Sequence, residues 1–369
     1  MNYKTNADSY IEKLILPSDP ASPMWNRENQ IFRKPMKWNY IDNCMIKAVT
    51  DLYKLNSDRR LIEYAAGFCR TYVDENGSIP TLTVSDFNLD NVNGGKNLLY
   101  LYRITKDERF RSAYRMIFND QLGSQPRLEC GSFWHKAIYP NQIWLDGAYM
   151  ALPFMVEYSI QEDSPQAMDD ALAQLKNIRD IMLDRNTGLY YHGYDETRSQ
   201  LWADKKSGLS HEFWLRAMGW LSAGLADIYE MTENTEIGNM LSELLMALNS
   251  CQCSDGMLLQ LPVRRDMNGN YPETSGTLLY AYSAMKSYRL GICGNSIRNS
   301  GEKAFLAVND NFIADGEVPV LKNICLMAGL GGANNRDGSA EYYISERRTE
   351  NDAKGIAPYI MAYTELLNK

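Results

Sequence analysis

One isolated carboxylate in an aromatic stretch is the first candidate for chemistry. The segment FWHKAIYPNQIWLDGAYMALPFM, residues 133–155, contains a single acid, Asp146, directly after Trp144 and Leu145. Apolar neighbours desolvate a carboxylate and raise its pKa, as a general acid at neutral pH requires. An aspartate before Gly147 would equally suit the N-cap of a helix. The residues alone leave both interpretations open.

A second acid, Asp90, lies in the segment FNLDNVNGGK and also precedes a predicted helix. Two carboxylates in one site can divide the acid and base roles of a hydrolysis. Asp and Asn before Gly-Gly are also common turn and cap residues, so for Asp90 taken alone the ordinary structural role is favoured. Only convergence with Asp146 would favour a catalytic role.

Candidate donors to a polar ligand stand in three further segments. His192 lies in YYHGYDE, and His135 with Lys136 lies in GSFWHKAIYP. Arg216 is four residues before Trp220, so the two would share one helix face, and a guanidinium beside an indole suits a carboxylate-bearing sugar. The alternatives are ordinary structural histidines and an interhelical salt bridge at Arg216.

Composition excludes several classes of function. The chain has 46 acidic and 38 basic residues, a net charge of −8, and no concentrated basic stretch, so nucleic-acid partners are not expected. No apolar run reaches the roughly 18 residues that span a bilayer, and the N-terminus lacks a leader pattern, which favours a soluble cytoplasmic protein with no membrane partner. Three histidines and seven scattered cysteines predict neither a metal site nor a cofactor.

The elements that would position these residues follow a repeated pattern. Six segments begin with small residues and continue with bulky apolar and aromatic ones, starting at residues 38, 93, 146, 218, 275 and 354. More charged, amphipathic segments lie between them, at residues 57–73, 107–122, 165–184 and 238–251. The pattern predicts an all-α (α/α)6 barrel, a ring of six helical hairpins forming one domain over residues 1–369. Two helical domains are the strongest alternative.

In such a ring, the inner helices would begin at one common end of the barrel. Asp90, Asp146 and Arg216 would then converge there. Glycines near the helix starts could simply allow neighbouring helices to pack closely. Helix N-termini also favour anions, so a carboxylated ligand would suit this end.

The segments FNLDNVNGGK, GSFWHKAIYPNQIWLDGAYMALPF, GLYYHGYDE, FWLRAMGW, ETSGTLLYAY and DGSAEYYISERRTENDAKGIAPYIMAY resemble one known group of enzymes. They are similar to the unsaturated glucuronyl and rhamnogalacturonyl hydrolases of glycoside hydrolase families 88 and 105, more closely family 105. The resemblance implies an (α/α)6 barrel that removes a 4,5-unsaturated uronic acid, of the rhamnogalacturonan type, from the non-reducing end of lyase-generated oligosaccharides. The chemistry that it implies is hydration of an enol ether.

The resemblance also implies roles for individual residues. Asp146, in WLDG, matches the general acid and base, and Asp90, in LDNVN, matches the second carboxylate of the site. The positions that would line the sugar site are Tyr40, His135, Lys136, Trp144, His192, Arg216 and Trp220. Three alternatives stand beside this hypothesis: an unsaturated glucuronyl hydrolase acting on other polysaccharide fragments, a conventional inverting glycosidase, and a non-catalytic oligosaccharide-binding toroid.

Overall fold

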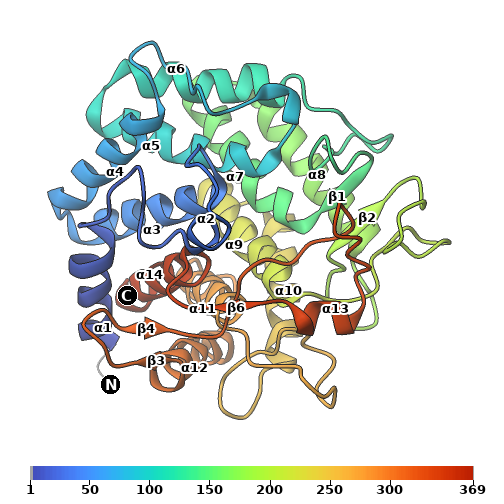
Figure 1. Ribbon diagram of the computed structural model, residues 1–369. Helices are drawn as coiled ribbons and strands as arrows, with labels where there is room; N and C mark the ends of the chain where they lie inside the picture. Colours follow the sequence, from blue (N-terminus) through green and yellow to red (C-terminus); the bar gives the residue numbers. More distant parts are fainter. Residues whose placement is uncertain (1–2, 369) are drawn as a thin grey trace.

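The computed structural model describes residues 3–368, and helices dominate it (Figure 1). Six helices form an inner ring, and each one contacts its two neighbours in the ring. In order they are α3 (Tyr40–Asn56), α5 (Gly94–Thr105), α7 (Leu145–Glu162), α9 (Leu215–Thr232), α11 (Thr274–Arg289) and α14 (Ala353–Leu367). The inner helices bury most of their residues, as expected of elements that are covered on every side.

Outer helices cover this ring. They are α1 (Tyr3–Tyr10) with the π-helical turn η1 (Ile11–Ile15), α4 (Arg59–Tyr72), α6 (Glu108–Met116) with the π-helical turn η4 (Ile117–Leu122), α8 (Pro165–Met182), α10 (Thr235–Ser250) and α12 (Asn295–Asn311). Two shorter helices, α2 (Arg27–Phe32) and α13 (Ala340–Ser345), and the 3-10 turns η2 (Val84–Asp86) and η3 (Leu89–Asn93), lie in the connections. The predicted (α/α)6 barrel is thereby confirmed.

The inner helices begin within three residues of the predicted starts, because their small-residue and aromatic pattern is local. Two outer elements had no sequence prediction. Helix α12 lies in the longest interval between inner starts, which also holds short strands, and α1 precedes the first predicted segment. Helix α1 is only eight residues long, whereas α12 has 17 residues and simply lies outside the segments that the pattern singled out.

The ring closes where the last inner helix meets the first. Helix α14 packs between α3 and α11, and α1 lies against α14 from outside. The rings of Tyr10 and Tyr359 meet edge to face, with centroids 5.4 Å apart, and the Tyr359 hydroxyl donates to Asn309 Oδ1 at 3.0 Å. In Figure 1 the red C-terminal helix accordingly lies beside the blue N-terminal part of the chain.

Three two-stranded antiparallel sheets occupy the connections in the described part of the chain. The strand pairs are β1 (Gln142–Trp144) with β2 (Gly193–Asp195), β3 (Ile313–Ala314) with β4 (Val320–Leu321), and β5 (Ile324–Cys325) with β6 (Arg348–Thr349). The β1–β2 register places Trp144 opposite Gly193, and so brings the segment before α7 beside His192. This pairing joins two connections that are far apart in sequence at the end where the inner helices begin.

Candidate active site

Asp146 is the second residue of α7, and its side chain faces the end of the barrel where the inner helices start. The N-cap position belongs to Trp144, whose side chain makes no capping bond, so the N-cap interpretation of Asp146 is wrong. The Asp146 Oδ2 atom instead lies 3.1 Å from His192 Nε2. A backbone bond from Leu145 N to His192 O, at 3.1 Å, holds the two segments in register. Asp146 remains partly open to solvent, with 17% of its side chain exposed.

The Asp146 carboxylate determines which way this hydrogen bond runs. An ionised carboxylate only accepts, so His192 Nε2 carries a proton and donates it to Asp146. On the other side of the ring, the Tyr343 hydroxyl lies 2.6 Å from Nδ1, and burial raises the pKa of Tyr343 well above its ordinary value, so the phenol keeps its proton and can donate to Nδ1. The result is a directed chain of hydrogen bonds from Tyr343 through His192 to the carboxylate.

The charge of Asp146 is stabilised in the unliganded protein. Burial raises its pKa. The hydrogen bond from His192 and the neighbouring positive groups, Arg216 among them, together lower the pKa by more than burial raises it, so it lies below the usual value. The expectation that apolar neighbours would raise this pKa is wrong for the free enzyme. Burial does desolvate the carboxyl group, but His192 and the neighbouring positive groups together outweigh that effect, and the fold brings these groups close to Asp146.

A second polar cluster surrounds Asp90 in η3. Lys136 Nζ lies 2.5 Å from Asp90 Oδ2, and His135 Nε2 lies 3.7 Å from Asp90 Oδ1, beyond hydrogen-bond range. Burial lowers the pKa of His135 to about 4, so this imidazole is neutral at pH 7. The His135 ring also stacks on Trp144, two residues before Asp146, with centroids 4.5 Å apart, so the two carboxylates lie in one neighbourhood. The predicted convergence of the two acids is therefore present.

Aromatic rings support both clusters. The Trp144 indole stacks on both His135 and Tyr139, with centroids 4.5 Å away in each case. Trp214 lies against His192, with centroids 4.8 Å apart, and under the Arg216 guanidinium, whose carbon is 4.7 Å from the ring centre. These stacks fix the orientation of the imidazole and guanidinium groups.

Arg216 is the second residue of α9 and only 2% exposed. Its Nη1 donates to Ser275 Oγ at 3.2 Å and to the carbonyl of Cys325. The indole under the guanidinium is that of Trp214 rather than that of Trp220. Trp220 lies four residues further along α9 and stacks on Tyr149, with ring centroids 4.8 Å apart.

Tyr40 begins α3 at the same end of the barrel. Burial raises the pKa of its hydroxyl well above the ordinary value, and the negative charges of Glu28 and Asp90 act in the same direction, while Arg216 opposes them. Tyr40 thus lies within the electrostatic range of both the Asp90 cluster and Arg216. The structure gathers eight of the nine predicted site residues at this end, and the ninth, Trp220, lies one turn further along α9.

Tyr343 and Trp214 are not distinguished by their sequence context. They lie in AEYYISERR and FWLRAMGW, and a tyrosine or tryptophan among such neighbours is more often part of a core. Within residues 3–368, no group of three His, Cys, Asp or Glu side chains is arranged to hold a metal ion. Over the same residues, no helix is both long and apolar enough to cross a membrane.

A six-hairpin ring that gathers two carboxylates, two imidazoles and stacked indoles at one mouth has the architecture of a glycoside hydrolase. The comparison with family models gives the family: the model for Glycosyl Hydrolase Family 88 matches residues 21–369. The chain belongs to this family. Membership makes the protein a hydrolase of glycosides and argues against a purely oligosaccharide-binding toroid.

Three individual similarities add detail. A family 105 glycoside hydrolase structure from C. acetobutylicum ATCC 824 superposes with a TM-score of 0.90 at 31% identity, covering 100% of this chain and 99% of that one. The unsaturated rhamnogalacturonyl hydrolase YesR of Bacillus subtilis is 23% identical over 363 residues, 95% of this chain and 96% of YesR. Protein Atu3128 of Agrobacterium fabrum is 35% identical over 230 residues, 59% of this chain and 98% of that protein.

Proposed function

We propose that this protein removes a 4,5-unsaturated uronic acid from the non-reducing end of oligosaccharides produced by a polysaccharide lyase. The observation that carries the proposal is Asp146, held at the mouth of the barrel by a directed hydrogen bond from His192, with Arg216 nearby. Family membership and the similarity to YesR support this reaction class. The similarity to YesR also favours a rhamnogalacturonan-type substrate within that class.

Asp146 would act as both acid and base in hydration of the enol ether. Its carboxyl group gives a proton to C4 of the sugar, and water adds at C5 while returning a proton to the carboxylate. The net change is addition of one water molecule. The resulting hemiketal at C5 opens and releases the remaining saccharide, so no covalent sugar–enzyme bond is required.

This role requires that Asp146 gain a proton before the chemical step. Substrate binding would favour this protonation, because the carboxylate of the uronic acid would bring a like charge close to Asp146 and the sugar would exclude water from it. Both effects raise the pKa of a carboxyl group. Arg216 would hold the uronate carboxylate, since a guanidinium matches its geometry. Asp90, fixed by Lys136, would orient the attacking water.

Loss of the ultraviolet absorbance of the unsaturated uronate tests the proposal directly. We expect the absorbance to fall when the enzyme meets lyase products, and Asp146→Asn to reduce kcat by about 10²–10⁴-fold, the usual contribution of general acid–base catalysis. Circular dichroism should show an unchanged fold. An Asn variant with wild-type activity would remove Asp146 from the mechanism.

A panel of lyase products from rhamnogalacturonan, glycosaminoglycans and ulvan-type polysaccharides separates the substrate alternatives. The rhamnogalacturonan product should show the highest kcat/KM. A preference for glycosaminoglycan products would favour an unsaturated glucuronyl hydrolase. Cleavage of saturated oligosaccharides, with none of unsaturated ones, would favour a conventional inverting glycosidase, whose two carboxyl groups flank a water molecule.

A further inference from the structure

A cavity opens at the other end of the barrel, where the inner helices finish. It has a volume of about 540 Å³, and all six inner helices contribute to its wall. Along α7, Asp146 comes first, Tyr149 lies one turn further, and Pro153 and Glu157 of the cavity wall lie further still. The stacked pair Tyr149 and Trp220 therefore lies between the candidate active site and this cavity.

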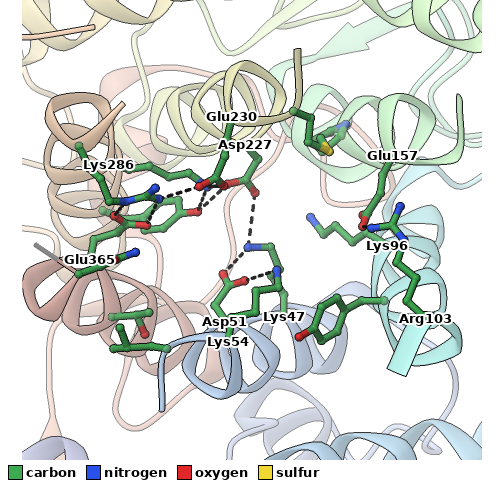
Figure 2. A pocket seen from close by; sticks show the side chains of 18 residues that line it. Lys47, Asp51, Lys54, Lys96, Arg103, Glu157, Asp227, Glu230, Lys286 and Glu365 are labelled. Carbon is green, nitrogen blue, oxygen red and sulfur yellow. Dashed lines mark hydrogen bonds and ion pairs between the residues drawn. The ribbon is translucent and has the colours of Figure 1, made fainter. Parts of the chain in front are cut away.

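Most charges in the cavity wall are mutually paired (Figure 2). One network links the residues Lys54, Asp51, Lys47, Asp227, Lys286, Glu230, Arg289 and Glu365. Arg103 and Glu157 form a separate pair at 2.8 Å. Every acidic side chain of the described wall is thus already bound to at least one cation.

Lys96 is the exception among the described cations of the wall. It is only 4% exposed, its Nζ forms no hydrogen bond, and no carboxylate in the described chain pairs with it. Its ammonium lies 3.7 Å from the centre of the Tyr149 ring, which is a cation–π contact. In Figure 2 its side chain points toward the centre of the charged ring, and no interaction line reaches it.

The charge balance of the cavity shows the same excess. The described wall contains six basic and five acidic side chains, so one positive charge is uncompensated when all are ionised. Burial lowers the pKa of Lys96 to about 8, although Asp227 opposes the effect, so the amine is still mainly protonated at pH 7. An unpaired buried charge is costly, and a ligand of opposite charge would remove that cost.

We infer that this cavity is a second binding site, for a monocarboxylate of about monosaccharide size, with Lys96 as its charge partner. One excess positive charge is neutralised by one negative charge. A dianion would leave one negative charge uncompensated beside the five wall carboxylates. The volume exceeds the needs of a simple inorganic anion. The site is separate from the candidate catalytic residues and does not depend on the proposed reaction.

Thermal unfolding in the presence of D-glucuronate, at constant ionic strength and pH 7, tests the site. A bound ligand stabilises the native state, so we expect a saturating concentration to raise the Tm of the wild type by roughly 2–4 °C more than that of Lys96→Met. Any binding of the probe near Asp146 adds equally to both proteins and cancels in this difference. Glucose, the uncharged counterpart, should give no Lys96-dependent rise.

Lys54→Met is the matched control. Lys54 lines the same cavity but pairs with Asp51 and is about half exposed, so this variant should keep the full response to glucuronate. Equal responses of the wild type and Lys96→Met would overturn the proposal, as would loss of the response in Lys54→Met alone. A Lys96-dependent rise with sulfate as large as that with glucuronate would overturn the assignment of a monocarboxylate.

Discussion

At the scale of single residues, the site depends on how one carboxylate is held. Asp146 accepts a hydrogen bond from His192 Nε2, and the Tyr343 hydroxyl supports this tautomer through its hydrogen bond with Nδ1 on the other side of the ring. Trp214 and Trp144 prevent the imidazoles from rotating away. The pKa of this carboxyl group therefore lies below its usual value. In the proposed mechanism, the uronate carboxylate would raise that pKa on binding and so couple substrate binding to protonation of the acid.

Removing the Tyr343 hydroxyl should change the pH dependence of catalysis. In Tyr343→Phe, the imidazole proton can move to Nδ1, and the bare Nε2 then faces the Asp146 carboxylate, which raises the pKa of Asp146. A general acid works when protonated, so kcat falls as pH rises through its pKa. We therefore expect the alkaline limb of the kcat profile to move to higher pH in the variant, and steady-state kinetics across pH would measure this.

Tyr342→Phe provides the matched control for this experiment. The neighbouring Tyr342 hydroxyl accepts a hydrogen bond from Gly329 N at 3.0 Å and does not contact His192. Its alkaline limb should coincide with that of the wild type. If both variants shift equally, or neither shifts, the hydrogen-bond chain does not tune Asp146.

At the scale of elements, close contact between inner helices positions the site. A Cβ atom on Gly276 of α11 would lie 2.4 Å from Leu215 Cγ and 3.1 Å from Arg216 N on α9. A Cβ atom on Gly95 of α5 would likewise lie 2.7 Å from the Phe154 ring on α7. These glycines allow neighbouring inner helices to approach at the end where Asp146 and Arg216 project. Their role is packing, one of the interpretations that the sequence allowed.

Gly276→Ala should displace the start of α9 and the Arg216 guanidinium with it. Overpacking of this kind costs about 1–3 kcal/mol of unfolding free energy, and we expect KM for the uronate substrate to rise. Gly67→Ala on the outer helix α4 is the control, because no atom lies within 4 Å of the added methyl group. That variant should be as stable as the wild type or slightly more so in urea unfolding. A Gly276→Ala enzyme with unchanged stability and KM would refute the packing argument.

Ion pairs hold the far ends of the inner helices together. Burial raises the pKa of Asp227 on α9, but Lys286 on α11 and Lys47 on α3 lower it much more, so the pKa lies well below the ordinary value. A carboxylate with a depressed pKa contributes stability that is complete above its unfolded-state pKa, about 3.9, and is lost as pH falls toward the native value. Stability from Asp227 should therefore decline only below about pH 4.

Asp227→Asn tests this contribution. At pH 7 the variant should lose about 3–5 kcal/mol of unfolding free energy, because buried Lys286 and Lys47 lose a charged partner. The difference from the wild type should shrink as the pH of urea unfolding falls below about 4. Glu75→Gln, which removes an exposed acid, should remain within about 0.5 kcal/mol of the wild type. A constant difference between pH 7 and pH 3 would contradict the ion-pair account.

At the scale of the whole molecule, closure of the ring makes each hairpin depend on its neighbours. Helix α14 contacts α3 at the start of the chain and α11 before it, while α1 covers α14 from outside. No inner helix has a free edge among the described elements. We therefore expect the chain to unfold as one domain, with a single transition in scanning calorimetry.

Tyr10→Ala should move that entire transition to lower temperature without splitting it. Tyr10 is fully buried against Tyr359, and loss of a buried aromatic ring costs about 3–5 kcal/mol. Tyr10→Phe is the control: the Tyr10 hydroxyl is buried without a hydrogen-bond partner, so its removal should leave stability unchanged or increase it. Two separated transitions in either protein would favour two domains.

The sequence by itself determined the six inner helices and the end of the barrel at which Asp146, Asp90 and their polar neighbours meet. Those predictions follow from patterns within single segments, where small and aromatic residues recur at helical spacing. Helices α1 and α12 were not predicted, because neither shows the small-residue and aromatic pattern that marks the inner ring.

Only the tertiary structure decided the chemical state of the site. Asp146 and His192 are 46 residues apart, and His192 and Tyr343 are 151 apart, so no local pattern reveals that they meet. The same is true of Arg216, which lies over Trp214 rather than Trp220. The pKa of a carboxyl group depends on charges and hydrogen-bond donors within a few ångströms, and here different hairpins supply those groups. Packing of the hairpins therefore sets the proton affinity of an acid whose position the sequence had already indicated.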